Sequence, residues 1–196
     1  MKLFAIFLIL VAFSACNQKT FDSKEALLKY LQDEDNGYIQ KKTVNGVDFS
    51  LMYRPTDLIV SQMLKSKKLN EADSLRKVYK DYLYFNLSIA KGNQEILSAL
   101  SSRNDFGRMV NRLAFGMEEK THLYTNKNDT IQILDYIYPR MFGTTNTTSV
   151  MFVYPNIEME DVQFLHFSVE DIGIGTGDIK FKIPIKKIRN QPKITF

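Results

Sequence analysis

The strongest constraint on this chain is its only cysteine, Cys16, which follows directly on an apolar segment. One cysteine cannot form an intramolecular disulfide, so the folded part must be held together by burial of apolar side chains, which make up 44% of the residues. The segment before it has a charged start, eleven apolar residues (Leu3–Phe13) and two small residues, Ser14 and Ala15. This order is typical of a secretory signal peptide, and the apolar run is shorter than the ~20 residues that cross a bilayer. We therefore predict a signal peptide over residues 1–15 rather than a buried N-terminal helix.

The segment Ala12–Cys16 resembles the lipobox of bacterial lipoproteins, in which the cysteine becomes the lipidated first residue of the mature protein. This resemblance implies that Cys16 is acylated and that residues 16–21 form a short tether. Each buried CH₂ of an acyl chain contributes ~0.8 kcal/mol, so two or more chains would hold the protein on a lipid bilayer. A free thiol in an ordinary secreted protein is the alternative interpretation.

Residues 22–196 are predicted to form a single α+β globular domain, with N-terminal helices and a β-hairpin followed by a mainly antiparallel C-terminal sheet. The hairpin is indicated by Asn45-Gly46, a strong type I′ turn signal between two strand-like segments. Capping residues and apolar spacing predict helices that begin near Asp22 or Ser23, after Pro55, at Asn70 and at Asn104 or Asp105. The strands predicted after Gly116 are 122–125, 130–138, 149–154, 162–169 and 178–185. Helices early and strands late, with short connections, favour α+β over a repeated βαβ arrangement.

Two helical stripes are expected to face the core. The helix after Asn70 is expected to bury Leu75, Val78 and Tyr79. The stripe of the following helix consists of Phe106, Met109, Val110, Leu113, Ala114 and Met117. Stripes of methionine and aromatic residues at this spacing are far more often core than cofactor sites.

Basic residues crowd the C-terminal segment. Between residues 178 and 196, six basic residues stand against one acidic residue, Asp178, which gives a local charge of +5. The residues proposed as contacts for an anionic partner are Lys180, Lys182, Lys186, Lys187 and Arg189. Such a partner would be a phosphorylated lipid headgroup, lipopolysaccharide or an acidic glycan. The alternative is a strand whose solvent face is coated with lysine to prevent edge pairing, which needs no ligand.

The two histidines, His122 and His166, both fall in predicted strands. Either could act as a general base with Ser168 as nucleophile, which gives an exported hydrolase as an alternative function. No G-x-S-x-G elbow is present, and a lone histidine in a strand is more often structural. Replacing both histidines by glutamine would separate a hydrolase from a non-catalytic protein.

Cofactor and metal sites are not indicated by the sequence, and none is predicted. Two histidines and one cysteine are too few for a three-histidine or four-cysteine zinc site. The glycine-rich segment Gly173–Asp178 precedes a strand-like run rather than a helix, so it does not match a dinucleotide loop. Glu170, Asp171 and Asp178 could bind calcium on this loop. A glycine-rich hairpin turn is the preferred interpretation of the segment.

Three further interpretations follow from composition and short motifs. Asp129-Thr130-Ile131 resembles the O-glycosylation sequon of Bacteroidetes-type envelope proteins, which makes Thr130 a candidate acceptor. Ten tyrosines and fourteen phenylalanines leave room for a small-ligand carrier with an aromatic pocket. The net charge of +4 does not argue for a nucleic-acid partner in an exported protein.

The hairpin segment Lys42–Asp57 and the later Asp171–Gly177 stretch resemble small uncharacterised lipoproteins of the Bacteroidetes-type cell envelope. The resemblance implies an outer-membrane lipoprotein of unknown activity and transfers no active-site residue. Surface-exposed members have acidic residues after the cysteine, whereas Asn17-Gln18-Lys19 follows here, so the periplasmic leaflet is favoured. The leading hypothesis is a non-catalytic binding or scaffold module that contacts an anionic envelope component or an envelope protein.

Overall fold

The computed structural model describes residues 18–64, 69–141, 144–158 and 161–196, so the predicted signal peptide and Cys16 lie outside the described residues. The described elements, with η marking 3₁₀ helices, are β1 (Thr20–Phe21), α1 (Lys24–Gln32), η1 (Glu34–Asn36), β2 (Ile39–Val44), β3 (Val47–Arg54), α2 (Thr56–Met63), α3 (Leu69–Tyr79), β4 (Tyr82–Lys91), β5 (Gln94–Glu95), η2 (Ile96–Ala99), α4 (Arg103–Phe115), α5 (Met117–Lys120), β6 (Thr121–Thr125), β7 (Thr130–Ile131), β8 (Asp135–Ile137), β9 (Thr148–Pro155), β10 (Phe164–Val169), β11 (Ile179–Pro184), α6 (Ile185–Arg189) and β12 (Lys193–Ile194).

The predicted α+β class is confirmed, with helices and a hairpin in the first half and mainly antiparallel strands in the second. The hairpin turn forms as expected, because Asn45 and Gly46 adopt φ values of 52° and 72°. A type I′ turn needs positive φ at both positions, and Asn-Gly tolerates it best. β2 and β3 therefore pair from Val44 and Val47 outward.

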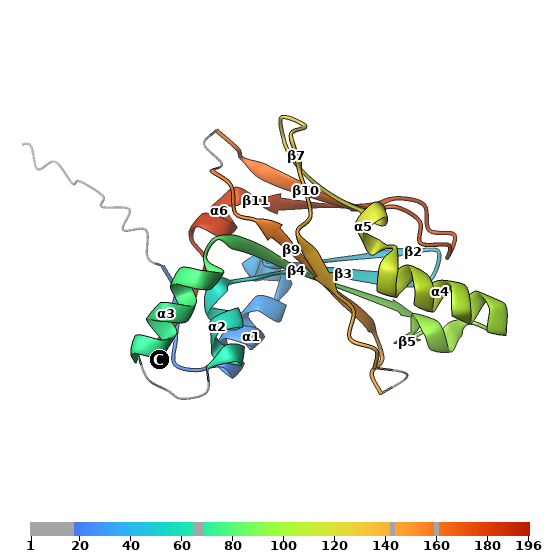
Figure 1. Cartoon of the computed structure of the whole chain (residues 1–196), viewed down its shortest axis with the longest axis horizontal. Coiled ribbons are helices and arrows are strands. Elements are labelled where there is room, and N and C mark those ends of the chain that lie inside the picture. Colours follow the sequence, from blue (N-terminus) through green and yellow to red (C-terminus); the bar gives the residue numbers. More distant parts are fainter. Residues whose placement is uncertain (1–17, 65–68, 142–143, 159–160) are drawn as a thin grey trace, which may run out of the picture.

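The large sheet has six strands, in the order β2-β3-β4-β9-β8 with β5 paired to β4. Its neighbouring strands are antiparallel. Residues alternate between its faces, so Phe49, Leu51 and Tyr53 of β3 are buried while Ser50 and Met52 are only partly covered. Figure 1 shows β4 and β9 running through the middle of the molecule.

The small sheet has the order β11-β10-β6-β7 and lies over the buried face of the large sheet. One side chain links the two layers: the Phe167 ring of β10 lies 5.7 Å from that of Phe85, 5.4 Å from Phe152 and 6.3 Å from Tyr154. All four rings are fully buried, so this aromatic cluster forms the centre of the core.

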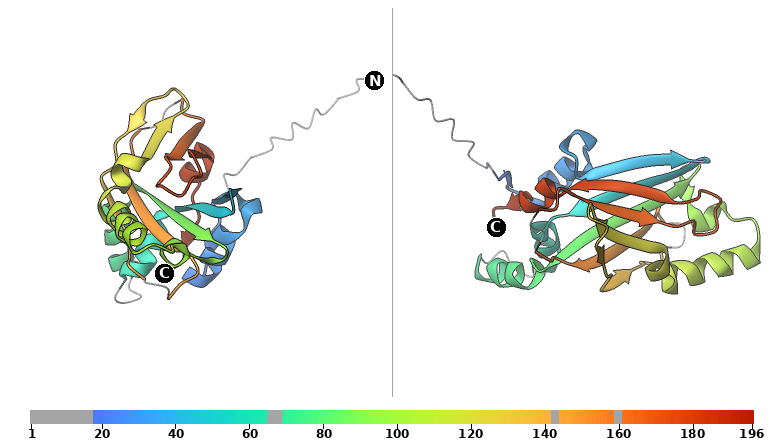
Figure 2. Two further views of the ribbon diagram at one scale, coloured as in Figure 1. Left: turned by 90° about the vertical axis from the view of Figure 1, so that its right-hand side faces the viewer. Right: turned by 90° about the horizontal axis from the view of Figure 1, so that it is seen from above.

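Helices close the two ends of this pair of sheets. α1, α2 and α3 gather at the end where residue 18 enters, and α4 lies at the opposite end (Figures 1 and 2). The stripe predicted for a single helix is divided between α4 and α5 at Gly116; it buries Met109, Leu113 and Met117, but Phe106 is 39% exposed. The expected burial of Val78 in α3 is wrong, since it is 58% exposed. α3 covers only the end of the molecule, and it buries Ala72 alone.

The segment predicted as a tether is already part of the fold at Thr20 and Phe21. These residues form β1, which pairs in parallel with β12. Lys193 N donates to Lys19 O and Thr195 N donates to Phe21 O, both at 2.9 Å. Gln18 Nε2 also donates to the carbonyl of Gln191 at 2.8 Å, so the chain is attached to the body from residue 18 onward.

Two other segments differ from the predicted elements. The predicted strand 130–138 is divided, because β7 belongs to the small sheet and β8 to the large one. Residues 132–134 carry the chain between the layers, and an alternating pattern does not reveal which sheet a strand joins. The predicted strand 178–185 ends at Pro184, after which α6 buries Ile185 and Ile188.

Replacing Phe167 by alanine is expected to lower the free energy of unfolding by about 3–5 kcal/mol, because it leaves a cavity between the sheets. Phe164→Ala is the matched control: this residue lies on the same strand and is only partly buried, so it should cost about 1 kcal/mol or less. Urea unfolding measures both losses. Equal losses of unfolding free energy in the two variants would contradict the central position of Phe167 between the sheets.

Candidate binding face on the small sheet

Strand alternation places several predicted site residues on the exposed face of the small sheet. In β11, Ile179, Phe181 and Ile183 point into the core, so Lys180 and Lys182 point outward. The antiparallel register sets Lys182 beside His166 and then Tyr124, and Lys180 beside Ser168 and then His122. We call this surface the basic-aromatic face; it consists of Lys180, Lys182, Phe164, His166, Ser168, His122, Tyr124 and Thr130.

The aromatic rings of this face pack against one another and against a lysine. Lys182 Nζ lies 3.7 Å from the centroid of the Phe164 ring, within cation–π range. The Phe164 and His166 rings meet edge to face at 5.1 Å and 86°. His166 stacks on Tyr124 at 5.1 Å and 22°. The result is an ordered row of rings with an ammonium group at one end.

A second charged group borders the same face. Glu170 accepts hydrogen bonds from Lys120 Nζ at 2.7 Å, and its other oxygen lies 2.9 Å from His122 Nε2. These two partners, Lys120 first and His122 second, hold the pKa of the Glu170 carboxyl below its ordinary value. The carboxylate therefore compensates the charge of Lys120, while Lys180 and Lys182 make no ion pair with any described residue.

The arrangement lacks a central feature of a serine hydrolase. His122 is bonded to a carboxylate and lies opposite Ser168 in the register. Within the described ranges, however, the Ser168 hydroxyl makes no hydrogen bond to His122 or His166, and it is buried. A serine nucleophile needs a base within hydrogen-bond reach. His166 instead packs its ring against Tyr124 and Phe164.

The five basic residues predicted as one contact set are divided by the structure. Lys180 and Lys182 lie on the basic-aromatic face, whereas Lys186, Lys187 and Arg189 belong to α6. Lys187 Nζ donates to the carbonyl of Asn36 at 2.6 Å, and it lies 5.2 Å from the Tyr38 ring. Lys187 thus serves packing between α6 and η1. Because β11 ends at Pro184, the strand alternation that turns Lys180 and Lys182 outward does not extend to the basic residues of α6.

The glycine-rich segment forms a turn around one carboxylate. Asp171 Oδ1 accepts from the backbone N–H groups of Gly173, Ile174 and Gly175 at 2.8, 2.9 and 3.2 Å. Burial acts to raise the pKa of Asp171, but the backbone donors outweigh it and lower the pKa. The preferred hairpin-turn interpretation explains this loop, and no cluster with metal-ligand geometry occurs among the residues that the structure describes.

Thr130 is exposed at the β7 edge of the basic-aromatic face, directly after Asp129. Its hydroxyl is accessible, and its glycosylation stays a prediction.

The carrier alternative predicts a cavity lined by aromatic side chains. The cavity of about 380 Å³ beside α4 is instead lined by Leu100, Asp105, Arg108, Met109, Arg112, Ile172 and Gly173.

Comparisons with known proteins give no family. No protein-family model matches the chain, and no curated protein matches it. A crystal structure of a novel protein of unknown function from Burkholderia pseudomallei K96243 aligns over 83% of this chain and 84% of its own, at 8% identity and a TM-score of 0.38. A similarity this distant supports no conclusion about either chain. None of the helices in the described part of the chain is long and apolar enough to cross a bilayer.

Lys120→Gln is expected to raise the pKa of the Glu170 carboxyl toward its ordinary value of 4.5, because it removes the main hydrogen bond to the carboxylate. Since folding lowers this pKa, the stability that the carboxylate contributes is present above pH 4.5 and lost as the pH falls below it. A pH titration followed by NMR of the carboxyl carbon measures the shift. Lys127→Gln, which removes a partner of Asp161 instead, is the control. An unchanged Glu170 pKa in the Lys120 variant would contradict this assignment.

Proposed function

We propose that this chain is a lipid-anchored lipoprotein of the bacterial cell envelope whose folded body is a non-catalytic binding module. The anchor is Cys16, in the outer membrane and preferably in its periplasmic leaflet. The binding surface is the basic-aromatic face, and its partner is an anionic envelope component, which we take to be an acidic glycan.

The N-terminal attachment supports the anchored part of the proposal. Gln18 and Thr20 are already bonded to the body through Gln191 and β12. Only Asn17 separates Gln18 from Cys16, and two residue steps span at most about 7 Å. A lipid on Cys16 would therefore keep the body against the headgroups, with little freedom to diffuse away from the membrane surface.

The single observation that carries the binding part is the Lys182 ammonium over the Phe164 ring, beside the stacked His166 and Tyr124. Flat aromatic rings contact the apolar faces of sugar rings, and ammonium groups attract carboxylate or phosphate substituents. Two lysines without a described acidic partner leave this face positive. An acidic glycan matches both properties.

The alternative interpretation, that these lysines prevent pairing with another strand, also has support, because β11 is an edge strand of the small sheet. Its edge is already occupied, however: Gln40 Nε2 donates to Lys182 O at 2.5 Å, and Gln40 Oε1 accepts from Lys182 N at 3.3 Å. The Gln40 side chain, which comes from β2, thus occupies the N–H and carbonyl groups of Lys182 that a further strand would need for pairing. This leaves the outward lysines available for a ligand.

Cys16→Ser is expected to abolish acylation and membrane retention, because serine offers no thiol for the thioether bond. Incorporation of labelled palmitate, together with fractionation after a high-salt wash, measures both. Ser14→Ala keeps a small residue before the cysteine and should behave like the original chain. A serine variant that stays with the membrane after the wash would contradict the anchor.

Lys180→Ala/Lys182→Ala is expected to weaken binding to purified peptidoglycan sacculi, an acidic glycan, by roughly ten-fold, at ~0.7 kcal/mol for each exposed ion pair. Co-sedimentation at rising salt measures the loss, and binding by the original chain should fall with salt. Lys77→Ala/Lys193→Ala removes the same charge elsewhere and is the control. Equal binding by all three proteins would contradict the assignment of this face.

A further inference from the structure

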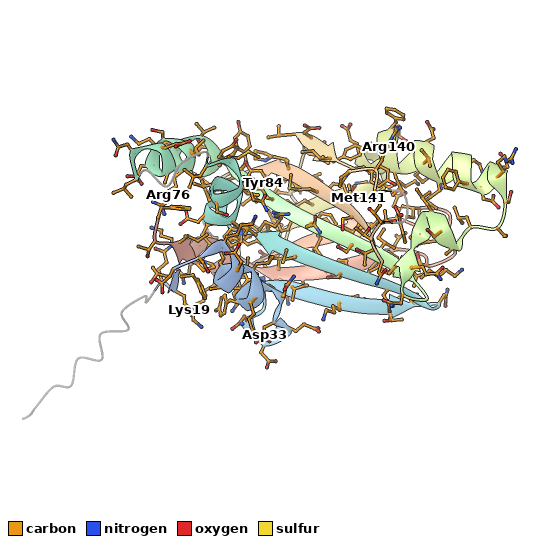
Figure 3. All side chains as sticks on the ribbon, turned by 90° about the horizontal axis from the view of Figure 1, so that it is seen from below. Lys19, Asp33, Arg76, Tyr84, Arg140 and Met141 are labelled. Atoms are coloured by element: carbon orange, nitrogen blue, oxygen red, sulfur yellow. The ribbon has the colours of Figure 1, made fainter. Side chains whose placement is uncertain are left out.

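A cavity of about 220 Å³ lies beside the point where Gln18 joins the body. The start of α2, the outer part of α3 and the segment leading into β12 form its walls. Three lysines line it: Lys77 from α3, Lys80 from the turn directly after α3, and Lys193 from β12. Figure 3 shows Arg76, which also lines the cavity, at the same end of the molecule as Lys19.

The acidic residue in the cavity wall does not neutralise these lysines. Asp57 is buried, and its carboxylate accepts from Arg76 Nε and Nη2 at 2.8 Å each and from Ile194 N at 2.7 Å. Arg76 therefore balances Asp57. The wall has four basic side chains and one acidic one, a net charge of +3. In the part of the chain that the structure describes, Lys77, Lys80 and Lys193 make no ion pair.

The cavity adjoins the point where the chain leaves toward Cys16. Gln191, another wall residue, accepts the hydrogen bond from Gln18. Lys193 pairs with Thr20 in the β1–β12 ladder. With Cys16 at most about 7 Å from Gln18, a lipid on that cysteine would bring the surrounding bilayer headgroups to the cavity.

We propose that this cavity binds the phosphate of an anionic phospholipid headgroup through Lys77, Lys80 and Lys193. Ammonium groups form charge-assisted hydrogen bonds with phosphate oxygens. The volume admits a headgroup but not the acyl chains, which stay in the bilayer. Binding would fix how the body is turned relative to the membrane. The inference rests on the proposed anchor for the nearness of the bilayer, whereas the charge and shape of the cavity do not depend on it.

Native mass spectrometry of the mature protein, purified in detergent, tests this proposal. Short-chain phosphatidylglycerol is added, with zwitterionic phosphatidylcholine in a parallel sample. We expect selective retention of phosphatidylglycerol, and Lys77→Ala/Lys193→Ala should weaken it about 25-fold, at about five-fold for each lysine. The same spectrum reports whether Cys16 carries acyl groups, so a failure of the anchor and a failure of the cavity are read separately.

Lys29→Ala/Lys91→Ala is the matched control, because it removes two exposed lysines that lie outside both proposed surfaces, and it should retain phosphatidylglycerol fully. Unchanged melting temperatures establish that the variants are folded. Equal retention of both lipids, or an equal loss in both double variants, would overturn the proposal. Displacement of phosphatidylglycerol by an equal concentration of inorganic phosphate would also overturn it, since the ligand would then be free phosphate rather than a lipid headgroup.

Discussion

The buried carboxylate of Asp57 joins parts of the chain that are distant in sequence. It lies in the first turn of α2, it is 4% exposed, and it binds the guanidinium of Arg76 in α3 and the backbone of Ile194 in β12. Leaving such a charge unpaired in the interior would be strongly destabilising, so each partner must stay in place. Arg76 Nη2 also donates to the Ile194 carbonyl at 2.8 Å. The position of β12, and through it that of β1, depends on this contact.

Local chemistry explains which parts of the fold were predictable. The Asn45-Gly46 turn and the strand on each side of it depend on neighbouring residues alone, and both were predicted correctly. Residues 130–138 alternate as one strand would, yet they are shared between two sheets, because β7 pairs with the preceding β6 while β8 pairs with the later β9. The short helix α6 was missed, since Ile185 extends the alternating strand pattern of Ile179, Phe181 and Ile183.

The two proposed surfaces differ in how far the sequence revealed them. The outward direction of Lys180 and Lys182 followed from alternation, but their meeting with His166 depended on the register of β10 and β11. The cavity had no local signal, because Lys77 and Lys193 come together only when α3 packs near β12. The count of C-terminal charges grouped Lys180, Lys182 and Lys193 by sequence, whereas the fold places the first two on a sheet face and Lys193 beside residue 18.

The parallel pairing of β1 with β12 also has a mechanical consequence. A pull on the chain along the axis of β1 stretches the hydrogen bonds Lys193 N to Lys19 O and Thr195 N to Phe21 O at the same time. When the force acts along the strands, these hydrogen bonds share the load. When a strand is pulled away from one end, its hydrogen bonds break one after another. A body held by its first residues would thus transmit tension from a moving membrane directly into the Asp57 contact rather than unravelling from its amino end.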